Sequence, residues 1–159
     1  MLDRLLGYYD QLLTRTIIMT SLYTVQLFTQ DEQTVTTDWE NFKQFGIFQL
    51  QTYPEDRPKE PVPLPNIQAA TVNKVIEYCE QHRDDEPYSE NTPIRHTEWD
   101  KAFIASLSRE EIFEVILAGN YLDMKPMLNL GCKQVANMIK NKTPDEIRDV
   151  FNIVARPPE

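Results

Sequence analysis

The stretch NYLDMKPMLNLGCKQVANMIKNKTPDEIRDVFNI, residues 120–153, holds the most regular helical pattern of the chain. Pro126 marks the start of one helix, and apolar side chains then recur along it at spacings of four, three and four residues. These residues are Leu128, Cys132, Val135 and Ile139. The stretch has no histidine, no glycine-rich loop and a single cysteine, so its regularity indicates a packing surface and not a reactive site.

A second helix begins inside the same stretch with a complete start signal. Thr143 serves as the N-cap, Pro144 occupies the first helical position, and Glu146 closes a capping box. Its apolar face consists of Ile147, Val150 and Phe151. The preceding helix has further apolar residues outside its stripe, namely Met127, Leu130 and Met138. These positions exceed what a terminal helix pair usually buries, so they either form a partner surface or complete the protein's own core.

Upstream, the pattern is that of a β-hairpin. Residues 22–28 alternate apolar and polar side chains and are rich in strand-forming types, and residues 29–38 supply a turn and a second short strand. A helix with three regularly spaced aromatic residues follows over residues 39–50, with Asp38 as its candidate N-cap. Gly46 is expected to end or kink that helix.

A proline-rich loop then leads to a longer helix. VPLP, residues 62–65, fits a short edge strand, where a missing backbone N–H is tolerated. Asn66 is the expected N-cap of the helix and His82 its last residue. Apolar side chains on one buried stripe of this helix are Val72, Val75, Ile76 and Cys79.

The next long helix is apolar along two strips. One side is lined by Ile112, Val115, Ile116 and Gly119. Phe113 and Leu117 add a second strip, and this width predicts a central helix that is buried on most sides. Strands come first and helices after them, so the predicted fold class is α+β.

Length and composition limit the possible functions. The 159 residues suffice for one domain with a core of its own. The net charge of −9 argues against binding to nucleic acid, whose phosphates would meet a surface of their own sign, and it leaves a basic protein partner open. No segment reaches the ~18 apolar residues of a membrane span. Residues 1–20 predict an amphipathic extension that docks on its own domain or on a partner, in preference to a secretory signal or a transit peptide.

Reactive side chains are few and scattered. Phosphate loops, nucleophile elbows and zinc-binding spacings are absent from the sequence, and the acidic clusters predict solvated surface. Cys79 and Cys132 are both expected to be buried, reduced thiols, because both occupy apolar helical positions. A disulfide or metal pair, and a functional role for His82 or His96, are minor alternatives. We therefore predict no catalytic residue, no cofactor and no metal site.

A resemblance to a known family is carried by three segments: residues 61–87, PVPLPNIQAATVNKVIEYCEQHRDDEP; residues 98–104, EWDKAFI; and residues 113–153, which contain NYLD, VANMIK and TPDEIR in series. They resemble the S-phase-kinase-associated (Skp-type) cullin adaptors of SCF ubiquitin ligases. The segments cover about half of the chain, and residues 22–53 match only as a hairpin followed by a helix.

The resemblance implies an α+β fold in three parts. Residues 1–20 form an N-terminal extension, and residues 21–124 form a BTB/POZ-like domain with a small sheet and helices. Residues 125–159 form C-terminal F-box-binding helices. The family is non-catalytic, cytoplasmic and nuclear, and it links a cullin scaffold to F-box proteins, which select substrates for ubiquitin transfer.

The resemblance also implies roles for particular residues. Asn120 and Tyr121 of NYLD correspond to the cullin-facing positions. The positions that receive the F-box helices correspond to Phe113, Ile116, Leu128, Cys132, Val135, Ile139, Phe151 and Ile153. An amphipathic helix laid into such a groove is a common recognition mode, so the resemblance favours the partner-surface interpretation of the C-terminal helices.

Departures from the family pattern keep a second hypothesis open. Family members continue beyond FNI with two more helices, whereas VARPPE follows here, so weaker or altered F-box binding is expected. The short YPEDRPKE replaces an acidic loop, and Gly119 and Pro126 stand where the family usually has alanine and glycine. A diverged paralogue or a mimic of the adaptor fits these features. The alternative function is a BTB-fold module for self-association, with a possible homodimer, or for scaffolding outside ubiquitin ligases.

Overall fold

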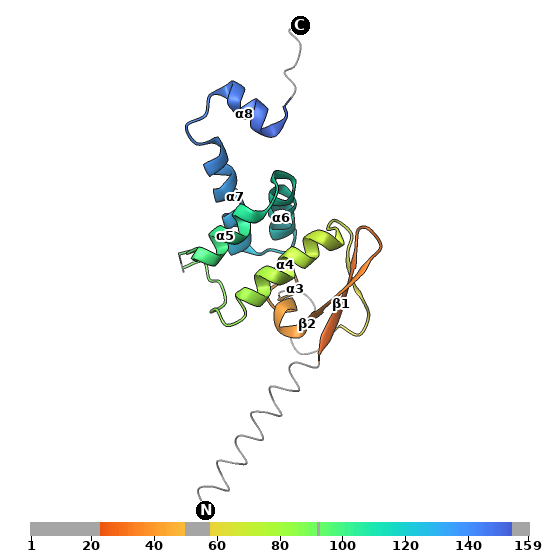
Figure 1. The fold of residues 1–159 in the computed structure, drawn as a ribbon. Helices are drawn as coiled ribbons and strands as arrows, with labels where there is room; N and C mark the ends of the chain where they lie inside the picture. The colour runs from red at the N-terminus through yellow and green to blue at the C-terminus, as the bar shows by residue number, and fades with distance from the viewer. Residues whose placement is uncertain (1–22, 50–57, 92, 154–159) are drawn as a thin grey trace, which may run out of the picture.

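A computed structural model of the chain describes residues 23–49, 58–91 and 93–153 (Figure 1). Its elements in chain order are β1 Thr24–Thr29, β2 Thr34–Asp38, α2 Trp39–Phe42, α3 Gly46–Gln49, β3 Val62–Leu64, α4 Ala69–Gln81, α5 Glu98–Ser106, α6 Arg109–Tyr121, α7 Lys125–Ile139 and α8 Pro144–Phe151. The sheet elements precede most of the helices, which confirms the predicted α+β class. The predicted N-terminal extension and VARPPE lie outside the described residues, as does most of YPEDRPKE.

The sheet has the order β2-β1-β3 among the described strands. β1 and β2 form the predicted antiparallel hairpin, with Leu27 opposite Val35, and β3 pairs with β1 in parallel, with Leu27 beside Val62. Leu27 is fully buried, whereas Phe28 on the opposite face of the sheet is 43% exposed. The alternation therefore turns one face of β1 toward the helices, and Pro63 is accommodated because β3 is an edge strand.

The helix predicted over residues 39–50 is interrupted. Asp38 caps α2 as expected, since its carboxylate accepts a 2.9 Å hydrogen bond from the Asn41 N–H. The helix ends at Phe42, however, and Gly46 begins the separate helix α3 instead of ending the first one. A Cβ at Gly46 would lie 2.5 Å from the carbonyl oxygen of Asp123, so glycine is needed here because another backbone approaches closely.

The N-cap of α4 was predicted wrongly. Asn66 lies in a turn that carries Ile67 into the core, and the helix begins at Ala69 after Gln68, which makes no side-chain cap. The acceptor comes from the hairpin instead, because Asp31 Oδ1 accepts a 2.9 Å hydrogen bond from the Ala69 N–H. The hydrogen bonds from Thr29 and Ala69 lower the pKa of Asp31, so this carboxylate is ionised at neutral pH.

Helix α6 is buried on one side and not on most sides, which corrects the prediction of a central helix. Val115 and Gly119 face the core with their neighbours Ile112 and Ala118, where α6 meets α4 and α7. The second strip points outward: Phe113 is 39% exposed and Leu117 is 66% exposed.

Helices α6 and α7 approach closely because glycines lie at their contact. A Cβ at Gly119 would lie 3.1 Å from the Leu128 backbone nitrogen, and a Cβ at Gly131 would lie 2.4 Å from Cγ1 of Ile116. The absence of side chains at these two positions fixes the spacing of the helix pair. It also seats Ile116 directly over the backbone of α7.

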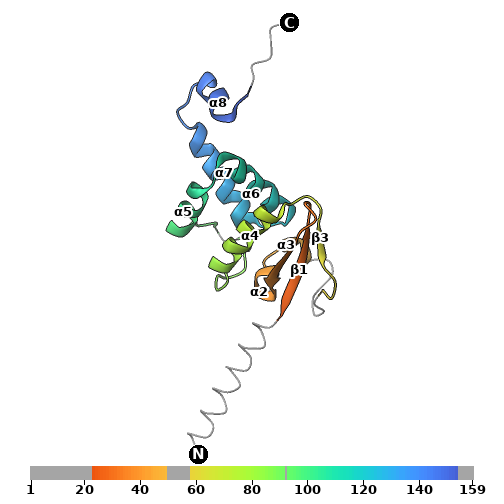
Figure 2. The same cartoon turned by 45° about the vertical axis from the view of Figure 1, so that its right-hand side comes forward.

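Helix α8 lies at the end of α7 that is farthest from the sheet, as both views show (Figures 1 and 2). Its predicted capping box is confirmed: the Glu146 N–H bonds to Thr143 Oγ1, and the Glu146 carboxylate accepts from the Thr143 N–H at 2.7 Å. None of the described residues of α8 is fully buried. Within the described residues, every helix is too short or too polar to cross a lipid bilayer.

Candidate protein-interaction surfaces

The outer side of α7 carries the stripe that the sequence singled out. Cys132 and Ile139 are exposed and Leu128 and Val135 are half-buried, whereas Met127 and Leu130 on the opposite side fill the core. The prediction of a buried thiol is therefore confirmed for Cys79 and wrong for Cys132. Cys132 lies on the outer face of α7, where its side chain is exposed.

Helices α6 and α8 extend this stripe into a larger surface. The Phe113 and Phe151 rings lie with their centroids 5.8 Å apart, and Ile153 just after α8 is 55% exposed. We call the following residues the apolar face: Phe113, Ile116, Leu128, Cys132, Val135, Ile139, Phe151 and Ile153. None of them is fully buried, although Ile116 and Val135 also pack against the core.

An arginine joins the two ends of this surface. Arg109 Nη1 donates a 2.5 Å hydrogen bond to the carbonyl oxygen of Val150 in the last turn of α8. A cation is favourable there, because the C-terminal carbonyls of a helix carry partial negative charge. Together with the Phe113–Phe151 ring contact, this bond seats α8 against the start of α6.

The NYLD turn lies at the other end of α6. Asn120 is exposed, Tyr121 is half-buried against the core, and Leu122 is buried. Asp123 adopts a left-handed conformation with φ 55°, and its carboxylate lies 2.8 Å from the Lys125 ammonium, which raises the pKa of that lysine. The turn thus exposes the Asn120 amide next to the Tyr121 ring, which packs partly against the core.

Helix α3 supports this turn from the side. The Ile47 N–H donates a 3.1 Å hydrogen bond to the Leu122 carbonyl, next to the close approach of Gly46 to Asp123. The aromatic segment that follows the hairpin therefore positions the NYLD turn. Nothing in the local sequence of either segment indicates this contact.

Leu117 is a surface residue that the sequence interpretation assigned to the interior. It lies four residues after Phe113 and four before Tyr121, so all three share one side of α6. Leu117 thereby connects the apolar face with the NYLD turn. Asn120 is polar and lies three residues after Leu117, on the same side of the helix. This spacing was the signal in the sequence that the strip faces outward.

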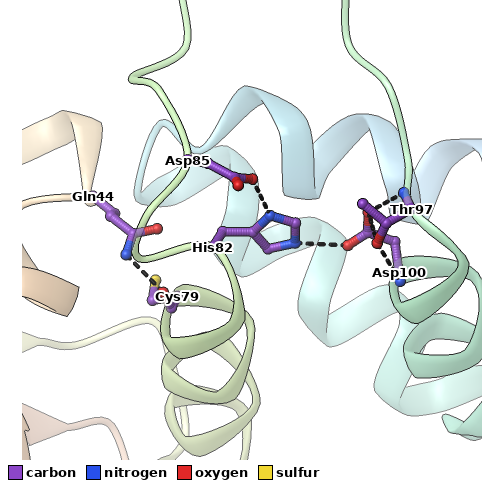
Figure 3. Close-up of polar contacts among 6 residues, drawn as sticks. All are labelled: Gln44, Cys79, His82, Asp85, Thr97 and Asp100. Carbon is purple, nitrogen blue, oxygen red and sulfur yellow. Dashed lines mark hydrogen bonds and ion pairs between the residues drawn. The ribbon is translucent and has the colours of Figure 1, made fainter.

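Both histidines and several of the carboxylates have structural partners. His82 Nδ1 lies 2.6 Å from Asp85, and His82 Nε2 lies 2.7 Å from Asp100, which is fully buried (Figure 3). Asp100 also accepts hydrogen bonds from the Thr97 N–H and hydroxyl at 2.6 and 3.0 Å. His82 therefore joins the end of α4 to the start of α5.

His96, Glu111 and Glu146 also have structural partners. His96 Nε2 is 2.9 Å from Oδ1 of Asn129. Hydrogen bonds from Ser108 lower the pKa of Glu111, and those from Thr143 lower the pKa of Glu146, because both carboxylates close capping boxes. In the described parts of the chain, no three histidine, cysteine or carboxylate side chains are placed to hold a metal ion.

Comparison with known proteins gives two matches to one family. Residues 24–84 match a model described as the Skp1 family tetramerisation domain, and residues 125–155 match one described as the Skp1 family dimerisation domain. These ranges contain the sheet with α4, and α7 with α8, and together they cover more than half of the chain. The boundaries predicted at residues 20 and 124 stay predictions.

Curated relatives agree with the family matches. The chain is 48% identical over 101 residues to "E3 ubiquitin ligase complex SCF subunit sconC" of Arthroderma benhamiae, covering 59% of this chain and 61% of the relative. It is 50% identical over 104 residues to the protein of the same name in Emericella nidulans, with 60% and 63% covered. It is 48% identical over 102 residues to "Suppressor of kinetochore protein 1" of Schizosaccharomyces pombe, with 58% and 62% covered.

The chain spans about three fifths of the length of the curated relatives it matches. The matched family domains, the identities near one half and the hairpin-plus-helices fold all point the same way. The chain belongs to the Skp1 family.

Proposed function

We propose that this protein is a non-catalytic adaptor that links a cullin scaffold to F-box substrate receptors in an SCF-type ubiquitin ligase of the cytoplasm and nucleus. The apolar face across α6, α7 and α8 is the observation that carries the proposal. A surface with Phe113, Ile139 and Ile153 between 37% and 55% exposed costs free energy in water, and a partner helix that covers it recovers that cost. Several relatives are named as SCF subunits, which supports the same role.

The F-box side of the proposal has a direct test. Ile139 is 37% exposed on α7, and Phe28 is 43% exposed on the sheet at the other end of the molecule, so the pair forms a matched set. Ile139→Asp should weaken binding of a recombinant F-box domain at least about tenfold, because the new carboxylate would be desolvated in the contact. Phe28→Asp should leave the affinity, measured by calorimetry, unchanged. Equal affinities for both variants would refute the assignment of this face.

The cullin side is assigned to the NYLD turn, with Asn120 and Tyr121 as the proposed contacts and Leu117 beside them. Tyr121→Lys should abolish binding of a cullin N-terminal domain. Because Tyr121 is half-buried, Asn120→Arg at the exposed position provides a second variant that leaves the core intact. Both variants should still bind the F-box domain, since the apolar face is unaltered. The assignment of the NYLD turn as the cullin contact would be wrong if both variants fold and both bind the cullin domain with the affinity of the wild type.

Self-association is the second candidate function. The matched family domains are described by dimerisation and tetramerisation, and the apolar face is a surface that a second copy could cover. Light scattering of the protein alone, over a hundredfold range of concentration, distinguishes the two. A dimer that persists when the F-box domain is added would favour self-association, and a dimer that dissociates into a one-to-one complex would favour the adaptor.

A further inference from the structure

The charged side chains of α7 and the turn after it are all basic, although the chain as a whole is acidic. The net charge is −9, yet residues 124–144 contain four lysines and no acidic side chain. Lys125 at the start of this segment is paired with Asp123 at 2.8 Å. Lys142, in the turn before α8, acts on Glu146, where it contributes to the lowered pKa. The other two lysines of the segment are Lys133 and Lys140.

Lys133 and Lys140 are exposed and form no ion pair with any residue in the described ranges. Lys133 lies within α7 and Lys140 is its C-cap residue; the seven residues between them are about two helical turns, so both lie on the same side of the helix. Each directly follows an exposed member of the apolar stripe, Cys132 or Ile139. The two lysines therefore form a cationic margin along one side of the apolar face.

The opposite margin of the stripe is closed by α6. Ile116 lies against Gly131, and Phe113 with Phe151 continues that wall toward α8. An occupant of the apolar face thus lies between an apolar wall and a row of two ammonium groups. A helix that fits this arrangement needs an apolar side toward α7 and acidic residues along the edge that passes Lys133 and Lys140.

We propose that the F-box segment recognised by this protein is an amphipathic helix with an acidic edge, and that Lys133 and Lys140 select it. This inference rests on the proposed adaptor function and specifies the chemistry of the partner. On a protein of net charge −9, an acidic segment is repelled by most of the surface, so the local positive margin directs it to the apolar face.

The test uses the full chain and a recombinant F-box domain. The double variant Lys133→Glu, Lys140→Glu should bind about tenfold or more weakly at low salt, mainly through slower association, because attraction at two sites becomes repulsion. Added salt should weaken the wild-type complex, because it screens the attraction, and should strengthen the variant complex, because it screens the repulsion. The matched control, Lys59→Glu with Arg95→Glu, makes the same change in net charge at exposed positions outside α6–α8 and should behave as the wild type.

A charge exchange completes the test. An F-box domain whose acidic edge residues are replaced by lysine should bind the Lys133→Glu, Lys140→Glu protein more tightly than it binds the wild type, since the pairing is restored in reverse. Circular dichroism and thermal unfolding should show the same fold for every variant. Additive effects in this exchange would overturn the proposal.

The remaining outcomes distinguish a failure of the acidic-edge proposal from a failure of the adaptor function. A wild-type complex with no sensitivity to the lysine changes would sink the acidic-edge proposal and leave the adaptor function standing. Failure of the wild-type protein to bind any F-box domain would remove both. Vesicles containing 30% phosphatidylserine provide the last arm: lysine-dependent binding to them would identify the margin as a membrane contact and overturn the proposed partner.

Discussion

Arg109 at the start of α6 donates a hydrogen bond to the Val150 carbonyl in the last turn of α8, at 2.5 Å. The two residues are far apart in sequence, and the other contact described between these helices is the ring pair of Phe113 and Phe151. Because α8 buries no residue completely, such contacts determine where its apolar side chains lie. The position of α8 in turn completes the apolar face.

Replacing Arg109 should therefore loosen α8 without unfolding the protein. Arg109→Gln removes a charge-assisted bond, which contributes about 1–2 kcal/mol to local closure. We expect roughly tenfold faster amide hydrogen exchange in α8 and little change in α4. Arg148→Gln is the control, since Arg148 pairs only with exposed Asp145 inside α8 among the described contacts. Identical exchange rates in wild type and Arg109→Gln would show that the bond does not hold the helix.

The contact of Gly46 with Asp123 predicts a selective effect on the NYLD turn. A Cβ at position 46 would collide with a backbone carbonyl, which cannot rotate away, so Gly46→Ala should cost about 1–3 kcal/mol of unfolding free energy and displace the turn. Affinity for a cullin N-terminal domain should fall while affinity for an F-box domain is retained. Val62→Ala, a stability loss in β3 away from the turn, is the control. A parallel loss of both affinities would argue for general destabilisation.

Asp100 should contribute much more to stability than Asp85, although both contact His82. Asp100 is fully buried and satisfies Thr97 as well, so Asp100→Ala leaves several polar groups without a partner and should cost about 3 kcal/mol. Asp85 is exposed, and Asp85→Ala should cost less than about 1 kcal/mol. Urea unfolding monitored by tryptophan fluorescence gives both values. Similar losses for the two variants would contradict this account of the contact.

The two thiols should differ in reactivity. Burial raises the pKa of Cys79 to about 12, so at pH 8 almost none of it is thiolate, whereas Cys132 is exposed on α7. Iodoacetamide should add one group to the native protein and two in denaturant, as counted by mass spectrometry. A bound F-box domain should protect Cys132. Rapid alkylation of Cys132 inside that complex would place the partner elsewhere.

Much of the fold was predictable because the signals are local. Two helix starts depend on residues no more than four positions apart, and both were confirmed: the Asp38 cap of α2 and the capping box of Thr143 and Glu146. The alternation that buries Leu27 is equally local. A capping side chain or a strand period acts over one turn or one pleat, so neighbouring residues suffice to specify it.

The errors arose where a partner came from a distant part of the chain. Asn66 was the expected cap of α4, but Asp31 supplies the acceptor from the hairpin turn. Gly46 was interpreted as the end of a helix or a kink in it, although its role is to admit the backbone of Asp123. No local pattern identifies a contact between residues so far apart in sequence.

The sequence by itself determined the order of strands and helices, the starts of α2 and α8, and the family to which NYLD and TPDEIR point. Only the tertiary structure decided which apolar strips are inside: Val115 is buried while Leu117 is exposed, and Cys79 is buried while Cys132 is exposed. The physical reason is that helical periodicity places side chains on a common side, whereas burial depends on what packs against that side.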